Sequence, residues 1–144
     1  MKYLLICFCL MPSFICQAQT KEQKEKDAIL AVMDMQVKAW NNYDLEKFMT
    51  GYWKSDSLKF YGKGGVTKGY ENTLKNYQKG YPSKDHTGIL RFKINDISKI
   101  NKGAYYVMGE YFLTRKVGDA NGIFMVLFKK IKGEWKMIAD TSCD

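Results

Sequence analysis

The second half of the sequence contains only strand-like segments separated by turns, and this feature limits the fold more than any other. Residues 90–95 alternate Leu, Phe and Ile with Arg, Lys and Asn, which is typical of a half-buried strand. Turns rich in glycine and asparagine separate three further segments, at residues 104–115, 123–131 and 135–142. This succession predicts a four-stranded antiparallel meander.

The first half of the sequence has the period of amphipathic helices. Apolar residues recur every three or four positions from residue 28 to Trp40. The preceding residues 20–27 are charged and are expected to be either frayed or the first turns of this helix. Asp44 is suited to cap a second, shorter helix, and a third is expected between Gly69 and Pro82.

Two short strands, at residues 58–61 and 66–68, are expected as a hairpin between the second and third helices. With the meander, these segments predict one α+β domain, in which three N-terminal helices pack on a curved, mainly antiparallel sheet.

The first eighteen residues have the pattern of an export signal. Lys2 precedes a short apolar run at residues 3–15, and small residues at Cys16 and Ala18 predict cleavage after Ala18. The run is shorter than the roughly 20 residues that a permanent membrane helix needs. We therefore expect residues 19–144 to be secreted or periplasmic, without stable membrane insertion after cleavage. An uncleaved anchor or a lipoprotein is the alternative.

Cleavage would change the inventory of reactive side chains. Cys7, Cys9 and Cys16 would leave with the signal, so Cys143 would remain without a partner for an internal disulfide. With His86 as the single histidine, a zinc site of the usual Cys/His type cannot form, and no metal is expected. The net charge of +8 comes from lysines scattered among acids, which weakly favours acidic ligands or surfaces. Export argues against nucleic acid as a partner.

Several segments resemble the nuclear transport factor 2-like (cystatin-like cone) superfamily. Residues 39–45 are similar to its break between the first two helices, and Gly69-Tyr70-Glu71 to the glycine that opens its third helix. Residues 133–140 resemble the closing strand of the domain of unknown function 4440 family, a relative of the SnoaL-like polyketide cyclases and ketosteroid isomerases. The resemblance implies a cone with a central pocket. This fold serves enzymes, binding modules and assembly domains alike.

The resemblance does not extend to the catalytic residues of the steroid isomerases. The position of their general base falls on Tyr61, and that of their oxyanion tyrosine falls on Gln36. Residues 122–128 contain no carboxylate for the second oxyanion donor. Histidines that relatives carry near the end of the closing strand are replaced by Ala139 and Thr141. Steroid-isomerase chemistry is therefore not expected.

Three other residues are candidates for acid/base catalysis: Glu110, Asp140 and His86. Glu110 stands in an apolar strand row, so its pKa would rise if that row faces the pocket; otherwise it pairs with a lysine on a neighbouring strand. Asp140 is either a pocket acid or a cross-strand partner. His86 follows Asp85 in a loop, where it is either a poised base or solvent-exposed.

Aromatic residues are abundant for so small a domain, and some are expected to line a ligand pocket. The predicted pocket consists of Trp40, Tyr52, Tyr61, Tyr77, Tyr106, Glu110 and Asp140. Such a lining suits a flat or amphipathic organic molecule. Aromatic rows on a sheet equally suit a homodimer interface.

The sequence thus predicts an exported domain that binds a small organic ligand without a cofactor. One alternative is a cofactor-free SnoaL-like enzyme, of isomerase, cyclase or hydrolase type, that uses a pocket carboxylate. A second is a non-catalytic dimerisation module.

Overall fold

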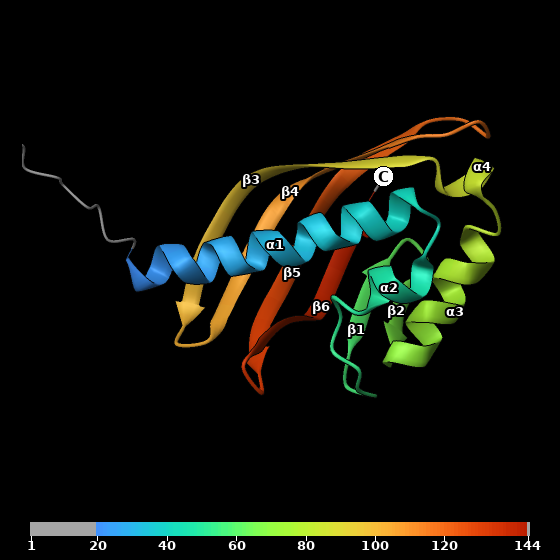
Figure 1. The fold of residues 1–144 in the computed structure, drawn as a ribbon. Helices are drawn as coiled ribbons and strands as arrows, with labels where there is room; N and C mark the ends of the chain where they lie inside the picture. Colours follow the sequence, from blue (N-terminus) through green and yellow to red (C-terminus); the bar gives the residue numbers. More distant parts are fainter. Residues whose placement is uncertain (1–19, 144) are drawn as a thin grey trace, which may run out of the picture.

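The fold is a curved six-stranded sheet with helices on one face and at one end (Figure 1). The computed structural model describes residues 20–143. The expected signal peptide, its cleavage site and the three cysteines within it lie outside the described residues. The strands are β1 (Lys59–Gly62), β2 (Gly65–Lys68), β3 (Ile89–Asn101), β4 (Ala104–Thr114), β5 (Ala120–Ile131) and β6 (Glu134–Cys143). The helices are α1 (Lys21–Asn41), α2 (Leu45–Met49), α3 (Tyr70–Gly80) and α4 (Lys84–Thr87).

The sheet has the order β2-β1-β6-β5-β4-β3. Strands β3 to β6 form the expected antiparallel meander, and the hairpin β1–β2 joins it by parallel pairing of β1 with β6. Helix α1 crosses the concave face, whereas α2 and α3 lie at the end of the sheet near β1 and β2 (Figure 1). The α+β architecture predicted from the sequence is therefore confirmed.

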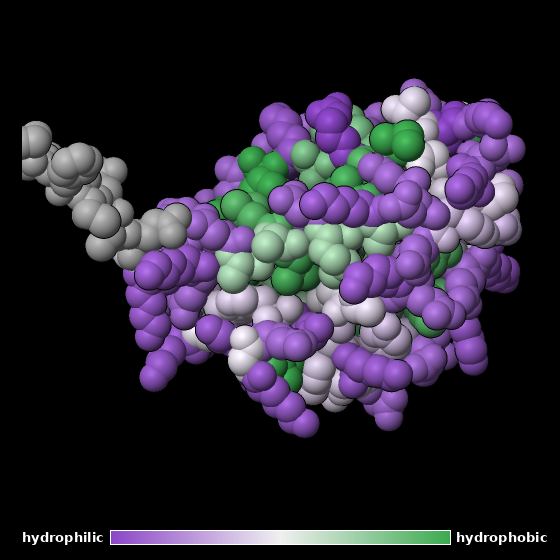
Figure 2. All heavy atoms as spheres, viewed as in Figure 1, coloured by the Kyte–Doolittle hydropathy of each residue, from purple (hydrophilic) through white to green (hydrophobic). Residues whose placement is uncertain are grey.

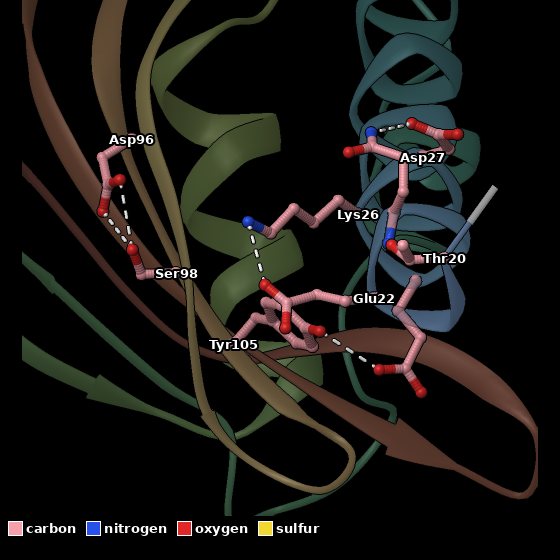
Figure 3. A network of polar contacts seen from close by, with 9 residues as sticks. Thr20, Glu22, Lys26, Asp27, Asp96, Ser98 and Tyr105 are labelled. Carbon is pink, nitrogen blue, oxygen red and sulfur yellow. Dashed lines mark hydrogen bonds and ion pairs between the residues drawn. The ribbon is translucent and has the colours of Figure 1, made fainter. Parts of the chain in front are cut away.

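Helix α1 begins earlier than its apolar pattern and includes the charged residues 21–27. Thr20 caps it by accepting a hydrogen bond from the backbone N–H of Gln23 at 3.2 Å. Tyr105 from β4 donates a hydrogen bond of 3.1 Å to Glu25, and Glu22 pairs with Lys26 at 3.1 Å (Figure 3). The start of α1 has no apolar face, and it is held instead by the Thr20 cap and by the contact between Tyr105 and Glu25.

Helix α4 is an element that the sequence pattern did not predict. Its C-cap is Gly88, whose φ of 59° and ψ of −141° lie in a region that other residues rarely adopt. A Cβ atom at Gly88 would lie 2.1 Å from the carbonyl oxygen of Thr114, so glycine also permits the close approach of β4. This turn leads the chain from the helices into the edge strand β3.

The line between α1 and β3 carries half-buried apolar side chains. Figure 2 shows hydrophobic residues gathered there, with hydrophilic residues around them. A groove of about 240 Å³ along this line is lined by Leu30, Val37 and Ile94, among others. The main cavity lies beneath α1, between this helix and the sheet.

Candidate ligand-binding cavity

A cavity of about 220 Å³ lies between the helices and the concave face of the sheet. A cavity of about 150 Å³ can hold a benzene ring, so this one has room for a substituted ring. Nine of its lining residues are aromatic, namely Trp40, Phe48, Tyr52, Phe60, Tyr77, Tyr81, Phe92, Tyr111 and Phe124. Among the described lining residues, Asp140 and Lys63 are charged.

A β-bulge in β6 directs Asp140 into the cavity. Leu127 pairs with Ala139 and the next residue of β5, Phe128, pairs with Met137, so Ile138 is an extra residue in β6. Because side chains alternate along a strand, this insertion places Asp140 on the same face as Met137. Both residues line the cavity, together with Ser142 two positions further on.

Three hydroxyl groups form a hydroxyl network with the buried carboxylate of Asp140. Tyr52 donates a hydrogen bond of 2.5 Å to one carboxylate oxygen, and Ser142 donates one of 2.8 Å to the other. The hydroxyl of Tyr77 lies 3.2 Å from that of Tyr52. The network joins β6 to α3 and to the chain that follows α2.

Burial controls the protonation of this network. Only 7% of Asp140 is exposed, and this desolvation raises its pKa to about 6, although the hydrogen bonds from Tyr52 and Ser142 act in the opposite direction. Burial, followed by the nearby charge of Asp140, raises the pKa of Tyr52 and of Tyr77 well above the ordinary value. Both tyrosines therefore stay protonated at neutral pH.

The aromatic wall is held by contacts between rings from three helical regions. The ring of Trp40 in α1 lies 5.0 Å from Phe48 in α2 and 4.6 Å from Tyr81 after α3, measured between centroids, in edge-to-face arrangements. The indole N–H of Trp40 also donates a hydrogen bond of 3.0 Å to the carbonyl of Thr87 in α4. Trp40 thus connects all four helices around the cavity.

Four of the residues predicted for the pocket line this cavity: Trp40, Tyr52, Tyr77 and Asp140. The structure places the other three elsewhere. Tyr61 is 57% exposed and lines a separate hollow on the outward face of the sheet.

Tyr106 and Glu110 belong to the outward row of β4. The alternate row, which includes Tyr105, Val107 and Tyr111, packs towards the helices. The sequence could not determine which row faces inward, because both rows of β4 are rich in apolar and aromatic residues.

Glu110 takes part in a cross-strand pair with β3, as the alternative interpretation of its row expected. Its carboxylate accepts hydrogen bonds from Lys93 at 2.7 Å and from Asn95 at 2.9 Å. The bond from Lys93, followed by that from Asn95, lowers the pKa of Glu110. A lowered pKa on the outward face is the opposite of what a pocket acid requires.

His86 lies in α4 and is half-buried, with its Nδ1 atom 2.8 Å from the hydroxyl of Ser83. It does not line the cavity, and a role in cavity chemistry has no geometric support.

Some residues that line the cavity were not predicted from the sequence. Gln36, at the position of the isomerases' oxyanion tyrosine, is 1% exposed; it lines the cavity and donates a hydrogen bond of 3.1 Å to the carbonyl of Phe48. Ser142 was detectable in principle, because it follows Asp140 by two positions on the same strand. Phe48 and Tyr81 also line the cavity, and they lie in the segments where the second and third helices were expected.

Within residues 20–143, no group of three or more histidine, cysteine or carboxylate side chains could hold a metal ion. In the same part of the chain, no helix is long and apolar enough to cross a membrane.

A helical layer over the concave face of a curved sheet, with an aromatic cavity between them, defines the cystatin-like class of α+β proteins. A protein of unknown function from Shewanella oneidensis MR-1, described as similar to nuclear transport factor 2, has 34% sequence identity and a TM-score of 0.80. The match covers 83% of this chain and 99% of that one. The chain belongs to the nuclear transport factor 2-like family.

More distant solved structures share the fold. A ketosteroid isomerase-like protein from Erwinia carotovora atroseptica has 16% identity and a TM-score of 0.66, over 83% of this chain and 95% of that one. A nuclear transport factor 2-like superfamily protein from Salmonella enterica has 12% identity and a TM-score of 0.68, over 84% of this chain and 91% of that one. No protein-family model matches the sequence, and neither does any curated protein.

Proposed function

We propose that this protein binds a small organic molecule in the cavity beneath α1. The observation that carries this proposal is a single buried carboxylate, held by two hydroxyl donors, in a wall that is otherwise mostly aromatic and aliphatic. Ligand pockets commonly combine an apolar lining with a few convergent polar groups that fix orientation. The aromatic lining and the cavity volume of about 220 Å³ suit a ligand built on one aromatic ring.

Substitution of Val126 tests this proposal with benzyl alcohol as the probe. Val126 is buried in the cavity wall, so Val126→Phe should fill the cavity and weaken binding at least tenfold. Val66→Phe makes the same change at an exposed site on β2 and should leave binding unaltered. Binding is measured from chemical-shift changes in ¹⁵N-labelled protein. If benzyl alcohol shifts no resonance of the cavity residues, or if both variants behave alike, the proposal is contradicted.

A second candidate function is acid/base catalysis by Asp140 on the bound molecule. The observation in its favour is the raised pKa of about 6, which lets the carboxyl group exchange a proton near neutral pH. If a ligand co-purifies with the protein and is converted by it, Asp140→Asn should lower kcat by about 10²- to 10⁴-fold. Glu110→Gln, on the opposite face, should leave kcat unchanged. Equal effects of the two substitutions would exclude Asp140 as the acid or base.

Export and subfamily are two further parts of the proposal. The charged, apolar and small-residue segments within residues 2–18 support a cleaved signal, which the N-terminal residue of protein recovered from the periplasm would test. The closing segment at residues 133–140 supports membership of the domain of unknown function 4440 group within the family. The homodimer expected from the aromatic rows stays a prediction. Met108, Ile123 and Met125 are exposed on the face where it would form.

A further inference from the structure

The direction of the hydrogen bonds in the hydroxyl network determines what the cavity offers to a ligand. Each tyrosine hydroxyl has one proton, and that of Tyr52 is directed to the carboxylate of Asp140. The proton between Tyr52 and Tyr77 must therefore come from Tyr77. Ser142 also directs its proton to Asp140. While Asp140 is ionised, the network has only acceptor positions left for a ligand.

The negative charge of Asp140 has no positive partner within the described chain. The ion pairs of residues 20–143 join Lys26 to Glu22, Lys93 to Glu110, Lys116 to Asp85 and Lys136 to Glu134. Buried charges in proteins are normally paired, because water no longer stabilises them. A cationic ligand would supply the missing partner.

The aromatic wall favours the same kind of ligand. Cations are attracted to the electron-rich faces of Trp, Tyr and Phe rings within about 6 Å of the ring centre. Trp40, Tyr77 and Phe60 line the cavity that contains Asp140, and Phe60 on β1 pairs with Asp140 on β6. A cation in this cavity would therefore be attracted both by the carboxylate of Asp140 and by the aromatic rings.

Positive charge elsewhere on the protein does not select the ligand at this site. The net charge of +8 acts over long distances, where salt screens it, and mainly changes the rate of encounter. Lys63 lines the cavity from the turn between β1 and β2, but it is exposed and makes no ion pair with Asp140. Its repulsion is weakened by the surrounding water.

We propose that the ligand of this cavity is an organic ammonium ion, whose N–H groups bind the Asp140 carboxylate and whose apolar body lies among the aromatic rings. This assignment rests on the proposed binding function and specifies its ligand class. A protonated primary or secondary amine on an aromatic or aliphatic body meets both requirements.

Three probes of nearly equal size test the assignment: benzylamine, benzyl alcohol and benzoate. On the same ring, benzylamine carries a cation with N–H donors, benzyl alcohol a neutral hydroxyl donor, and benzoate an anion. At pH 7.5, benzylamine should bind at least tenfold more tightly than benzyl alcohol, and benzoate should bind weakest. Dissociation constants are measured by ¹⁵N chemical-shift titration.

Three variants identify the source of the preference. Asp140→Asn should reduce the advantage of benzylamine over benzyl alcohol to less than about threefold, whereas Glu110→Gln, which neutralises a carboxylate on the outward face, should retain it. Lys63→Gln should leave the advantage equal or larger. The spectrum of each variant shows whether it is folded. Repeating the titrations of the unaltered protein at pH 5, where Asp140 is mostly protonated, should also reduce the advantage and does not depend on the folding of a variant.

The outcomes separate the two proposals. If benzyl alcohol binds in the cavity as tightly as benzylamine, or if benzoate binds tightest, the cavity still binds ligands but the ammonium assignment is overturned. An advantage of benzylamine that survives in Asp140→Asn also overturns it. If none of the three probes binds, both the assignment and the proposed binding function are contradicted.

Discussion

Asp140→Asn should make the protein more stable at pH 7, by about 3 kcal/mol in free energy of unfolding. The pKa of Asp140 is about 6 in the folded protein and 3.8 ordinarily, so keeping it ionised when folded costs about 3 kcal/mol. Asparagine has the same shape and no charge. Its oxygen can still accept the hydrogen bond from Tyr52.

The gain should depend on pH in a defined direction. Between about pH 4 and pH 6, the folded protein holds a proton on Asp140 that the unfolded chain has already released. The wild-type protein therefore loses stability as the pH rises through this window. The advantage of Asp140→Asn should be absent below about pH 4, grow across the window and be complete at pH 7.

Urea unfolding of both proteins at pH 4, 5 and 7 measures this difference. Glu110→Gln is the matched control, because it also neutralises a carboxylate on the sheet. Since the pKa of Glu110 is lowered, its charge stabilises the folded state as the pH rises, and this control should show the opposite trend. A destabilised Asp140→Asn at pH 7, or a gain that does not change with pH, would contradict the burial of an unpaired charge.

A stabilising substitution at Asp140 would also bear on function. Residues that lower stability persist where activity needs them, and binding and active sites are the usual places. Asp140 occupies a core position that an uncharged residue would fill at lower cost. That cost supports a role for its carboxylate in ligand binding or chemistry.

The architecture was predictable from the sequence because its signals are local. Turn residues such as Gly103 and Gly133 separate the strands, and both have the positive φ that such turns require. Asp44 caps α2 as expected, by accepting a hydrogen bond from Lys47. Glycine, asparagine and proline mark element ends through backbone chemistry, which a sequence displays directly.

The cavity was only partly predictable because it depends on strand faces and register. In β4, the sequence gives no reason to place Tyr105 rather than Tyr106 in the core. In the structure the odd-numbered row faces inward, and Phe124 packs closely on Gly109 of that row. The bulge at Ile138 reverses the parity of β6, so counting from Trp135 assigns Asp140 to the outward face. Bulges arise from the pairing between strands, and no residue type near Ile138 indicates that a bulge forms there.

Trp40→Ala should have the largest effect on stability, a loss of about 3 to 5 kcal/mol in free energy of unfolding. Trp40 is 3% exposed, and truncation of a buried tryptophan removes its transfer energy and leaves a void. It also removes the hydrogen bond to the carbonyl of Thr87, which joins α1 to α4. Because small domains have only about 5 to 15 kcal/mol in total, the variant should be measured at low temperature.

Trp40→Phe separates the two contributions, since it keeps a ring against Phe48 and Tyr81 but cannot donate the hydrogen bond to Thr87. It should lose clearly less stability than Trp40→Ala. Trp53→Ala, at a half-buried position outside the cavity, should also lose less.

Indole added to Trp40→Ala should then restore part of the lost stability, because a ligand that binds only the folded state stabilises it by mass action. The same concentration of indole should raise the stability of Trp40→Phe much less, since that site is nearly filled. A loss below about 1 kcal/mol for Trp40→Ala would mean that the aromatic wall does not hold the helices on the sheet. Failure of indole to act would show that the wall collapses on truncation, and that the cavity depends on Trp40 for its shape.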